Sequence, residues 1–163
     1  MGISRFNGAI KMFWTQEIWS QTQCRYSKGF ITSFEEHEYL SPTFHSEFNY
    51  MGEKWQCIGE AYDCLAEEIT GESEKIRIMG NIIYHFFKQK PLLAEKLINT
   101  KGLWIGPQVK NHDLFWFKCC CPNCFTEMSF NYYGRLLMEV RDRLIWENKE
   151  KRYNSRNWVK RYF

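Results

Sequence analysis

The stretch from Ser73 to Asn99, SEKIRIMGNIIYHFFKQKPLLAEKLIN, decides the fold class of this chain. Its apolar side chains recur at intervals of three and four residues, the spacing that places them on one face of an α-helix. Ser73 is a suitable N-cap, whereas Pro91 ends the first helix and suits the first turn of a second. Gly102 closes that second helix before the extended run Leu103–Ile105. We therefore predict two helices that form a hairpin.

One further helix is predicted on each side of this hairpin. The first lies within residues 54–68 and ends before Gly71. The other begins near Asn131 and runs to about Lys149. Its apolar face consists of Tyr133, Leu136, Leu137, Val140 and Leu144, and the side chains expected to face water are Arg135, Glu139, Asp142 and Arg143.

Residues 9–50 carry short aromatic and β-branched runs, which predict strands or extended loops. The runs are Ile10–Trp14, Phe30–Phe34 and Phe44–Tyr50, broken by Gly29 and Pro42. The predicted fold class is therefore mainly α (α+β): a compact single multihelical domain with a small N-terminal β-hairpin region.

Length and composition limit the classes of protein. A chain of 163 residues suits a single domain, residues 1–163, and a hydrophobic fraction of 44% predicts a packed core. The net charge of +3 is too small to establish a nucleic-acid partner. The chain has neither an apolar run of about 18 residues nor the charged and apolar start of a secretory leader. We therefore expect a cytoplasmic location and no membrane partner.

Residues 150–163 form a basic aromatic C-terminal segment, EKRYNSRNWVKRYF, which follows the last predicted helix. Lysine and arginine interleaved with aromatic rings suit phosphates and stacked bases. In the alternative interpretation the segment is solvated, and Trp158 and Phe163 pack back onto the core.

Seven cysteines, an odd number without a secretory leader, indicate thiols or metal ligands rather than a disulfide framework. Cys121 and Cys124 enclose the turn CPNC, which is half of a tetrahedral zinc site. Cys119, Cys121 and Cys124 are the candidate ligands for a structural zinc ion, and a remaining ligand is to be sought among His112, Cys57 and Cys64. In the alternative, the run that includes Cys120 supplies free thiols that fill a loop.

Four patches in order resemble the NADAR superfamily, the YbiA-like N-glycosidases. They are EYLSP (38–42), FNYMGEKW (48–55), FKQKPLLAEKLINT (87–100), and DLFW (113–116) with the helix that carries Asn131, Gly134, Leu137, Met138 and Arg141. The resemblance implies an α+β fold and a hydrolase of the N-glycosidase or ADP-ribosyl-hydrolase type that requires no cofactor. It also implies the hairpin in residues 48–55.

The resemblance implies the site residues as well. Asp113 and Glu60 are the expected catalytic carboxylates, and the expected substrate-binding residues are Trp116, Tyr62, Asn131, Gly134 and Ser41. Two features depart from the family. Gly59 stands where the family has glutamate, so that Glu60 is displaced by one residue, about 100° on a helix. The family's following lysine has no counterpart, because Ala66 and Glu67 occupy its region.

The resemblance implies removal of ADP-ribose from a modified nucleobase in DNA, with ADP-ribosylated nucleic acid or an ADP-ribose-like ligand as partner. A residue usage rich in Lys, Ile, Asn, Phe and Tyr suits a minimal phage-type member that counters a DNA ADP-ribosylating toxin in the host cytoplasm. Two alternatives stay open: an N-glycosidase acting on a small ribosylamino metabolite, and a non-catalytic ADP-ribose- or nucleic-acid-binding module. Outside the resemblance, Asp113 would by default be a surface or capping residue, and Asn131 an N-cap.

Overall fold

The computed structural model describes residues 29–109, 112–119, 121–124 and 129–162, with side chains described as far as Tyr153. Within these residues the chain forms four α-helices, a short 3-10 helix at Glu38–Leu40 and three two-stranded sheets. The predicted mainly α (α+β) class is confirmed. The predicted run Ile10–Trp14 lies outside the described residues.

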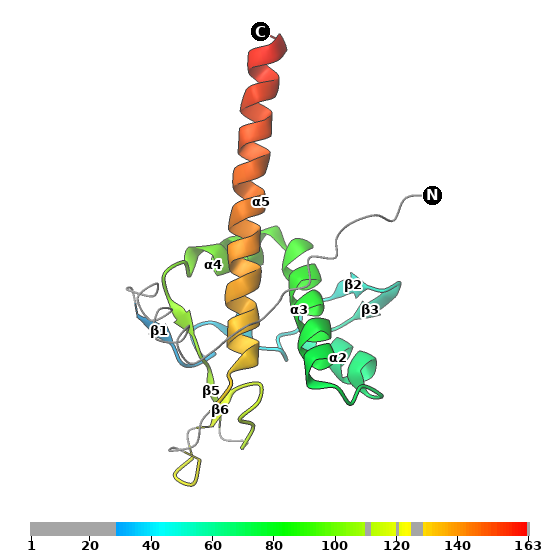
Figure 1. Ribbon diagram of the computed structural model, residues 1–163, viewed down its shortest axis with the longest axis vertical. Helices are drawn as coiled ribbons and strands as arrows, with labels where there is room; N and C mark the ends of the chain where they lie inside the picture. Colours follow the sequence, from blue (N-terminus) through cyan, green and yellow to red (C-terminus); the bar gives the residue numbers. More distant parts are fainter. Residues whose placement is uncertain (1–28, 110–111, 120, 125–128, 163) are drawn as a thin grey trace.

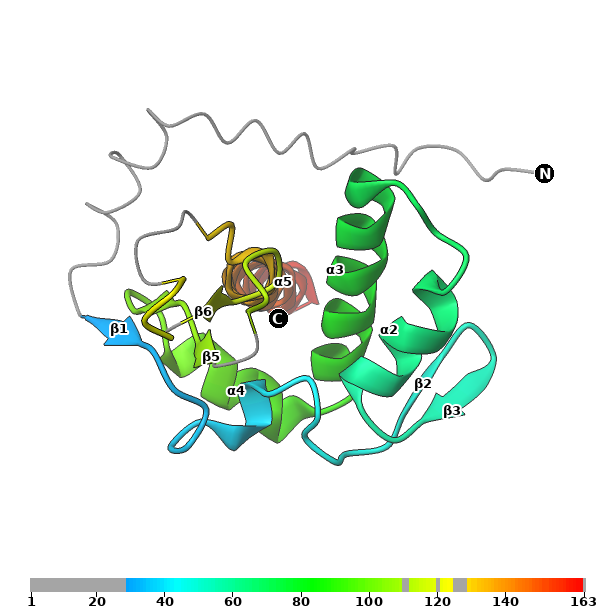
Figure 2. The same cartoon turned by 90° about the horizontal axis from the view of Figure 1, so that it is seen from below.

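Helices α3 (Glu72–Lys88) and α4 (Pro91–Asn99) form the predicted hairpin, joined by Gln89 and Lys90. Pro91 occupies the first turn of α4, as predicted, because proline has no N–H to lose there. Helix α3 begins two residues earlier than expected, with Gly71 rather than Ser73 at the N-cap. Viewed along the axis of α5, α3 and α4 lie beside that helix, and α2 lies on the far side of α3 (Figure 2).

Helix α5 (Tyr132–Tyr162) packs against α3 and α4 and carries the predicted apolar face into the core. The buried residues on this face are Tyr133, Leu136, Leu137, Val140 and Leu144. Polar contacts join the same elements: Glu147 accepts a hydrogen bond from the Tyr84 hydroxyl at 2.8 Å and pairs with Lys88. The buried Arg141 donates to the carbonyl oxygens of Thr100 and Leu103, both at 2.9 Å.

The prediction that Arg135 and Glu139 face water is wrong, whereas Asp142 and Arg143 are exposed as predicted. Arg135 is buried and its guanidinium lies 5.5 Å from the centroid of the Tyr132 ring. Glu139 is half-buried, and burial raises the pKa of its carboxyl to about 7 although the charge of Arg135 opposes the change. Helical periodicity reports the pattern within one helix and carries no information on what covers its polar side.

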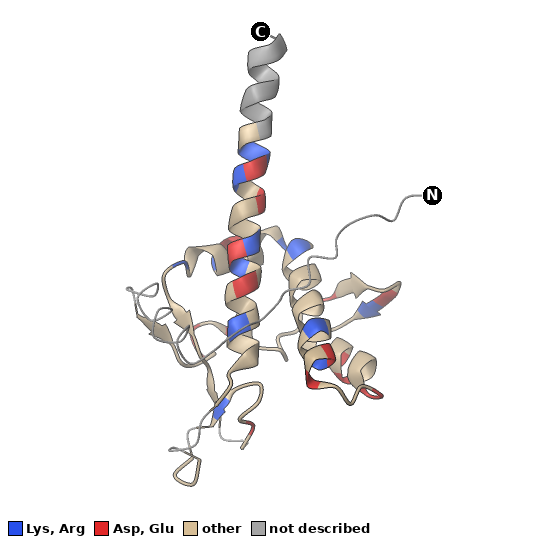
Figure 3. Ribbon diagram, in the orientation of Figure 1, with Lys and Arg blue, Asp and Glu red and all other residues tan. Residues whose placement is uncertain are grey.

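Helix α5 also continues well past its predicted end near Lys149. Residues 150–162 contain neither glycine nor proline, so no residue in that segment stops the helix. The C-terminal part of α5 extends beyond the other elements, and its described cationic and acidic residues alternate along the exposed surface (Figures 1 and 3). The expected packing of Trp158 and Phe163 lies outside the described side chains.

Strands β2 (Phe48–Tyr50) and β3 (Glu53–Trp55) form the antiparallel hairpin that the resemblance implied. Met51 and Gly52 turn the chain with φ angles of 55° and 86°, the paired positive values of a type I′ turn. Helix α2 (Ile58–Ala66) follows, and it begins four residues later than the start of the predicted region because Lys54 and Trp55 belong to β3.

The remaining strands form two parallel pairs. β1 (Phe30–Ile31) pairs with β4 (Trp104–Ile105), and β5 (Gln108–Val109) pairs with β6 (Lys118–Cys119). The second pair places the chain that precedes α5 beside the start of that helix (Figure 1). Each helix in the described part of the chain is too short or too polar to cross a lipid bilayer.

Candidate functional site

Asp113 organises a tight turn before β6. Its Oδ1 atom accepts hydrogen bonds from the backbone N–H groups of Phe115 at 3.0 Å and Trp116 at 2.8 Å. An aspartate that bonds the backbone two and three residues ahead stabilises a turn in the way that it caps a helix. The capping role is therefore present, and it also fixes the orientation of the carboxylate.

This Asp113 turn, residues 113–116, is bonded directly to the start of α5. Three successive carbonyl groups of the turn, those of Leu114, Phe115 and Trp116, accept hydrogen bonds from Phe130, Tyr132 and Tyr133, at 2.8, 3.1 and 3.0 Å. The turn and the N-terminal end of α5 are consequently a single structural unit.

Five aromatic rings form a row beside Asp113. Tyr62 of α2 contacts Trp116 edge-on with 5.2 Å between ring centroids, and Trp116 contacts Phe115 at 4.8 Å. Phe115 contacts Tyr132 at 4.8 Å, and Tyr132 stacks on Phe130 at 5.4 Å with an interplanar angle of 5°. We call these residues the aromatic row. At its end, Phe130 is 46% exposed, so one ring offers a face to a ligand.

The structure thus brings together three of the predicted site residues: Asp113, Trp116 and Tyr62. Burial raises the pKa of the Tyr62 hydroxyl, the charges of Asp63 and Asp113 raise it further, and the Trp116 side chain opposes the change. Sequence reasoning missed Phe115, Tyr132 and Phe130 as site residues. The aromatic residues within DLFW and at the start of the last helix were a signal for them.

Asn131 and Gly134 lie against strand β4. The side chain of the buried Asn131 donates from Nδ2 to the carbonyl oxygen of Ile105 at 2.9 Å. The backbone carbonyl oxygen of Asn131 accepts the first helical hydrogen bond, from the N–H of Arg135. A Cβ atom on Gly134 would lie 2.1 Å from the oxygen of Ile105 and 2.7 Å from the Asn131 side chain. The contacts of both residues therefore hold α5 against β4.

Glu60 contacts the N-terminus of α2. Its Oε2 accepts a hydrogen bond from the backbone N–H of Gln56 at 2.6 Å, while the Cys57 sulfur accepts from the Glu60 N–H at 3.5 Å. Cys57 is thus the N-cap of α2, and the Glu60 side chain reaches back to the residue before it. Because Glu60 and Tyr62 are about 200° apart on the helix, they face different sides, and it is Tyr62 that reaches Trp116. The structure does not bring Glu60 to the Asp113 turn.

Gly59, at the position of the family's glutamate, faces the segment that contains Ser41. Its N–H donates to the carbonyl oxygen of Pro42 at 2.8 Å, and a Cβ atom there would lie 3.3 Å from that oxygen. The Ser41 hydroxyl bonds the Thr43 hydroxyl at 2.9 Å. Ser41 therefore lies at the junction of the 3-10 helix with α2.

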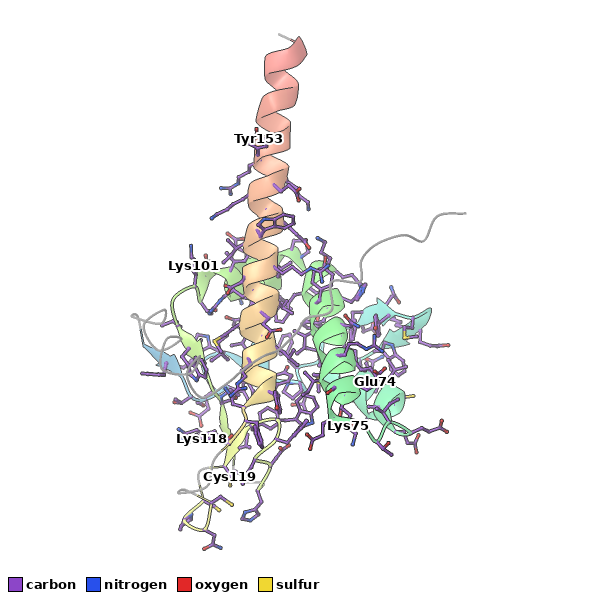
Figure 4. The ribbon with its side chains drawn as sticks, in the orientation of Figure 1. Glu74, Lys75, Lys101, Lys118, Cys119 and Tyr153 are labelled. Atoms are coloured by element: carbon purple, nitrogen blue, oxygen red, sulfur yellow. The ribbon has the colours of Figure 1, made fainter. Side chains whose placement is uncertain are left out.

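Three of the predicted cysteines converge with one histidine beyond the Asp113 turn. The ligand atoms of His112, Cys119, Cys121 and Cys124 all lie within 4.8 Å of one another, so this Cys₃His cluster could hold a metal ion. Figure 4 labels Cys119 at the end of the molecule where β6 meets the start of α5. Cys57 at the N-cap of α2 and Cys64 on α2 lie outside the cluster, and Cys120 lies outside the described residues.

The thiols of the cluster influence one another. Burial disfavours the Cys121 thiolate, but the backbone N–H groups of Cys124 and Asn123 and the neighbouring thiols outweigh it and lower the pKa of Cys121 to about 7. The hydrogen bond with Cys121 and burial raise the pKa of Cys124 to about 12.

Comparison with known proteins supports the fold. Neither a protein-family model nor a curated protein matches the sequence. The structure resembles the NMR structure of the E. coli protein YbiA with a TM-score of 0.59 and 17% sequence identity, over 75% of this chain and 86% of that protein. The chain therefore has a YbiA-like fold.

Proposed function

We propose that this chain with a YbiA-like fold is an N-glycosidase that removes ADP-ribose from a modified nucleobase in DNA. The observation that carries the proposal is the Asp113 carboxylate, oriented by two backbone hydrogen bonds beside the aromatic row. The four-patch resemblance to the NADAR superfamily and the YbiA-like fold support the same reaction class.

The reaction requires a fixed negative charge. When the bond between ribose C1 and the base nitrogen breaks, positive charge develops on the sugar as an oxocarbenium-like ion. A carboxylate already held in place stabilises that charge without reorganisation of the site. Water then adds its oxygen to C1, and its proton is transferred to the departing nitrogen. In this scheme Asp113 stabilises the cation and orients the water.

The aromatic row supports a nucleobase substrate. Rings that present a face next to a carboxylate can stack on a base or on the adenine of ADP-ribose. Phe130 extends this row to the surface, where a base in a single-stranded DNA could reach it. The exposed lysine and arginine residues of α5 near Lys151 suit the phosphates of the same strand.

Two other functions are alternatives to this proposal. A small ribosylamino metabolite would need Asp113 and Trp116 but not the exposed Phe130. A non-catalytic ADP-ribose- or nucleic-acid-binding module is favoured by Gly59 at the family's glutamate position and by the capping role of Glu60.

One experiment separates the three functions. The purified chain is incubated in parallel with ADP-ribosylated single-stranded DNA and with the corresponding ADP-ribosyl nucleoside, and free ADP-ribose is measured by mass spectrometry. Faster release from DNA supports the proposal, and release from the nucleoside alone supports the metabolite enzyme. Binding of either compound without release would replace the proposed reaction with the binding module.

Phe130→Ala is expected to lower kcat/KM on ADP-ribosylated DNA by about fivefold to a hundredfold, because stacking of one base on an aromatic ring contributes about 1–3 kcal/mol. Turnover of the nucleoside should change much less, and stability should hold because Phe130 is 46% exposed. Phe30→Ala is the matched control, since Phe30 is 68% exposed and lies on β1. Equal losses in the two variants on DNA would contradict the role of Phe130.

Glu60→Gln is expected to change turnover by less than about threefold, because substitutions of exposed side chains usually cost less than about 0.5 kcal/mol. The amide oxygen of glutamine can still accept the hydrogen bond from Gln56, so the N-terminus of α2 is retained. Steady-state kinetics on the DNA substrate measures the effect. A loss as large as that expected for Asp113→Asn would instead make Glu60 the second catalytic carboxylate.

A further inference from the structure

We infer that His112, Cys119, Cys121 and Cys124 form a structural zinc site, and that the bound zinc holds the Asp113 turn in place. The metal site itself is independent of the proposed function. Only the importance of the Asp113 turn for catalysis rests on the proposed function.

The donor set and its spacing suit zinc. Three thiolates and one imidazole are a common set for structural zinc, with Zn–S bonds of about 2.3 Å and Zn–N bonds of about 2.0–2.1 Å in a tetrahedron. Such bonds place sulfur atoms roughly 3.8 Å apart and nitrogen roughly 3.5 Å from sulfur. His112 Nδ1 lies 3.2 Å from the Cys124 sulfur and 3.4 Å from the Cys121 sulfur, and every ligand pair is within 4.8 Å. Small side-chain movements would complete the tetrahedron.

The backbone around the cluster is arranged for thiolates. In the CPNC turn the N–H of Cys124 donates to the carbonyl oxygen of Cys121 at 3.2 Å. The N–H groups of Asn123 and Cys124 also face the Cys121 sulfur. Hydrogen bonds from backbone to a ligand atom orient that ligand and stabilise its charge. The turn therefore presents Cys121 and Cys124 together.

The other two ligands come from different parts of the chain. Parallel pairing of β5 with β6 places Cys119 opposite Val109, and the chain returns from β5 through His112. His112 has a φ angle of 59°, a left-handed conformation that costs a non-glycine residue free energy unless its surroundings hold it. A bond from Nδ1 to zinc would supply such a restraint.

The site has a direct consequence for Asp113. His112 and Cys119 bracket residues 113–118, so binding both to one ion closes a short loop around the Asp113 turn. Closing a loop removes conformational freedom from it. The opposite side of the turn is already bonded to the start of α5 through Leu114, Phe115 and Trp116. Zinc would thus complete the restraint on the carboxylate.

The first test of the metal site measures the zinc content of the purified protein. Protein purified under reducing conditions is expected to carry about one zinc ion per chain and to melt at a lower temperature after chelation. Cys121→Ser should lose most of the zinc, whereas Cys64→Ser, which changes an exposed cysteine outside the cluster, should keep it. Metal-free protein that does not take up added Zn²⁺, or equal zinc in the two variants, would overturn the site.

Cobalt provides a measurement on the unaltered chain, which remains valid if Cys121→Ser does not fold. Apoprotein titrated with Co²⁺ should develop the visible absorption of a tetrahedral ion and the near-ultraviolet absorption of cobalt–thiolate bonds, and Zn²⁺ should displace both. A spectrum of octahedral cobalt without thiolate absorption would exclude the cluster as the ligand set.

The positioning role is tested by amide hydrogen exchange, without any substrate. The Phe115 and Trp116 amides, bonded to Asp113 Oδ1, are expected to exchange at least about tenfold faster after zinc removal, while amides within α3 stay protected. Unchanged exchange at Phe115 and Trp116 would show that zinc does not hold the turn. Because zinc content and exchange are measured without turnover, their failure is distinguishable from failure of the proposed reaction.

Discussion

Asp113→Asn is expected to lower the release of ADP-ribose from DNA by at least about a hundredfold while the protein stays folded. Asparagine has nearly the size of aspartate, and its amide oxygen can still accept the hydrogen bonds of Phe115 and Trp116. The substitution removes only the negative charge. If that charge stabilises the oxocarbenium-like transition state, the loss falls mainly on kcat rather than on KM.

Single-turnover kinetics measures the loss of activity, and thermal melting of the same preparation measures whether the protein stays folded. Asp63→Asn is the matched control, because Asp63 is an exposed carboxylate whose charge also reaches the Tyr62 hydroxyl. That variant should retain turnover close to the unaltered chain. A folded Asp113→Asn protein with near-normal release of ADP-ribose would remove Asp113 from the catalytic site.

Gly134→Ala is expected to destabilise the fold by at least about 3 kcal/mol, which corresponds to roughly 6–12 °C in melting temperature for a chain of this size. The added Cβ would lie 2.1 Å from the carbonyl oxygen of Ile105, so strand β4 and helix α5 would have to separate. Both atoms belong to or adjoin backbone, and no side-chain rotation relieves the collision.

The control for this variant is another glycine with room for a methyl group. Gly71 has a φ angle of −77°, and an added Cβ there would lie 3.9 Å from its nearest neighbour, Glu74 Cβ. Gly71→Ala should therefore shift the melting temperature by only a few degrees. Similar melting temperatures for the two variants would mean that α5 and β4 are not in close contact at Gly134.

The helices could be predicted because apolar periodicity is a local property. In α3 and α4 the apolar spacing and the position of Pro91 agree, so the sequence predicted that both helices exist, their order, and the start of each to within two residues. The ends depend on weaker signals. Helix α2 starts later than predicted because the first predicted turn belongs to the strand that contains Trp55. Helix α5 continues past Lys149 because the charged residues there are compatible with a helix and the segment contains no stop signal.

Three of the four residues of the Cys₃His cluster, Cys119, Cys121 and Cys124, were candidates from the sequence. Cys121 and Cys124 are three residues apart, so a single turn determines their contact and the sequence alone predicts it. The sequence left the fourth member open among His112, Cys57 and Cys64, and the position of His112 beside Cys119 depends on the pairing of β5 with β6, which is a contact between separated segments. Spacing in the sequence carries no information on that pairing.

By itself, the sequence determined the mainly helical class and the apolar residues that enter the core from α5, because both follow from the spacing of neighbours along the chain. The β2–β3 hairpin was implied by the resemblance of residues 48–55 to the NADAR superfamily. Only the tertiary structure decided which candidate residues meet. Packing of α2 against the turn before β6 brings Tyr62 to Trp116 and leaves Glu60 at a helix cap, and the approach of β4 buries Asn131 against Gly134. The physical reason is that such contacts depend on which elements pack together, and packing depends on the shape and burial of the whole chain rather than on any one segment.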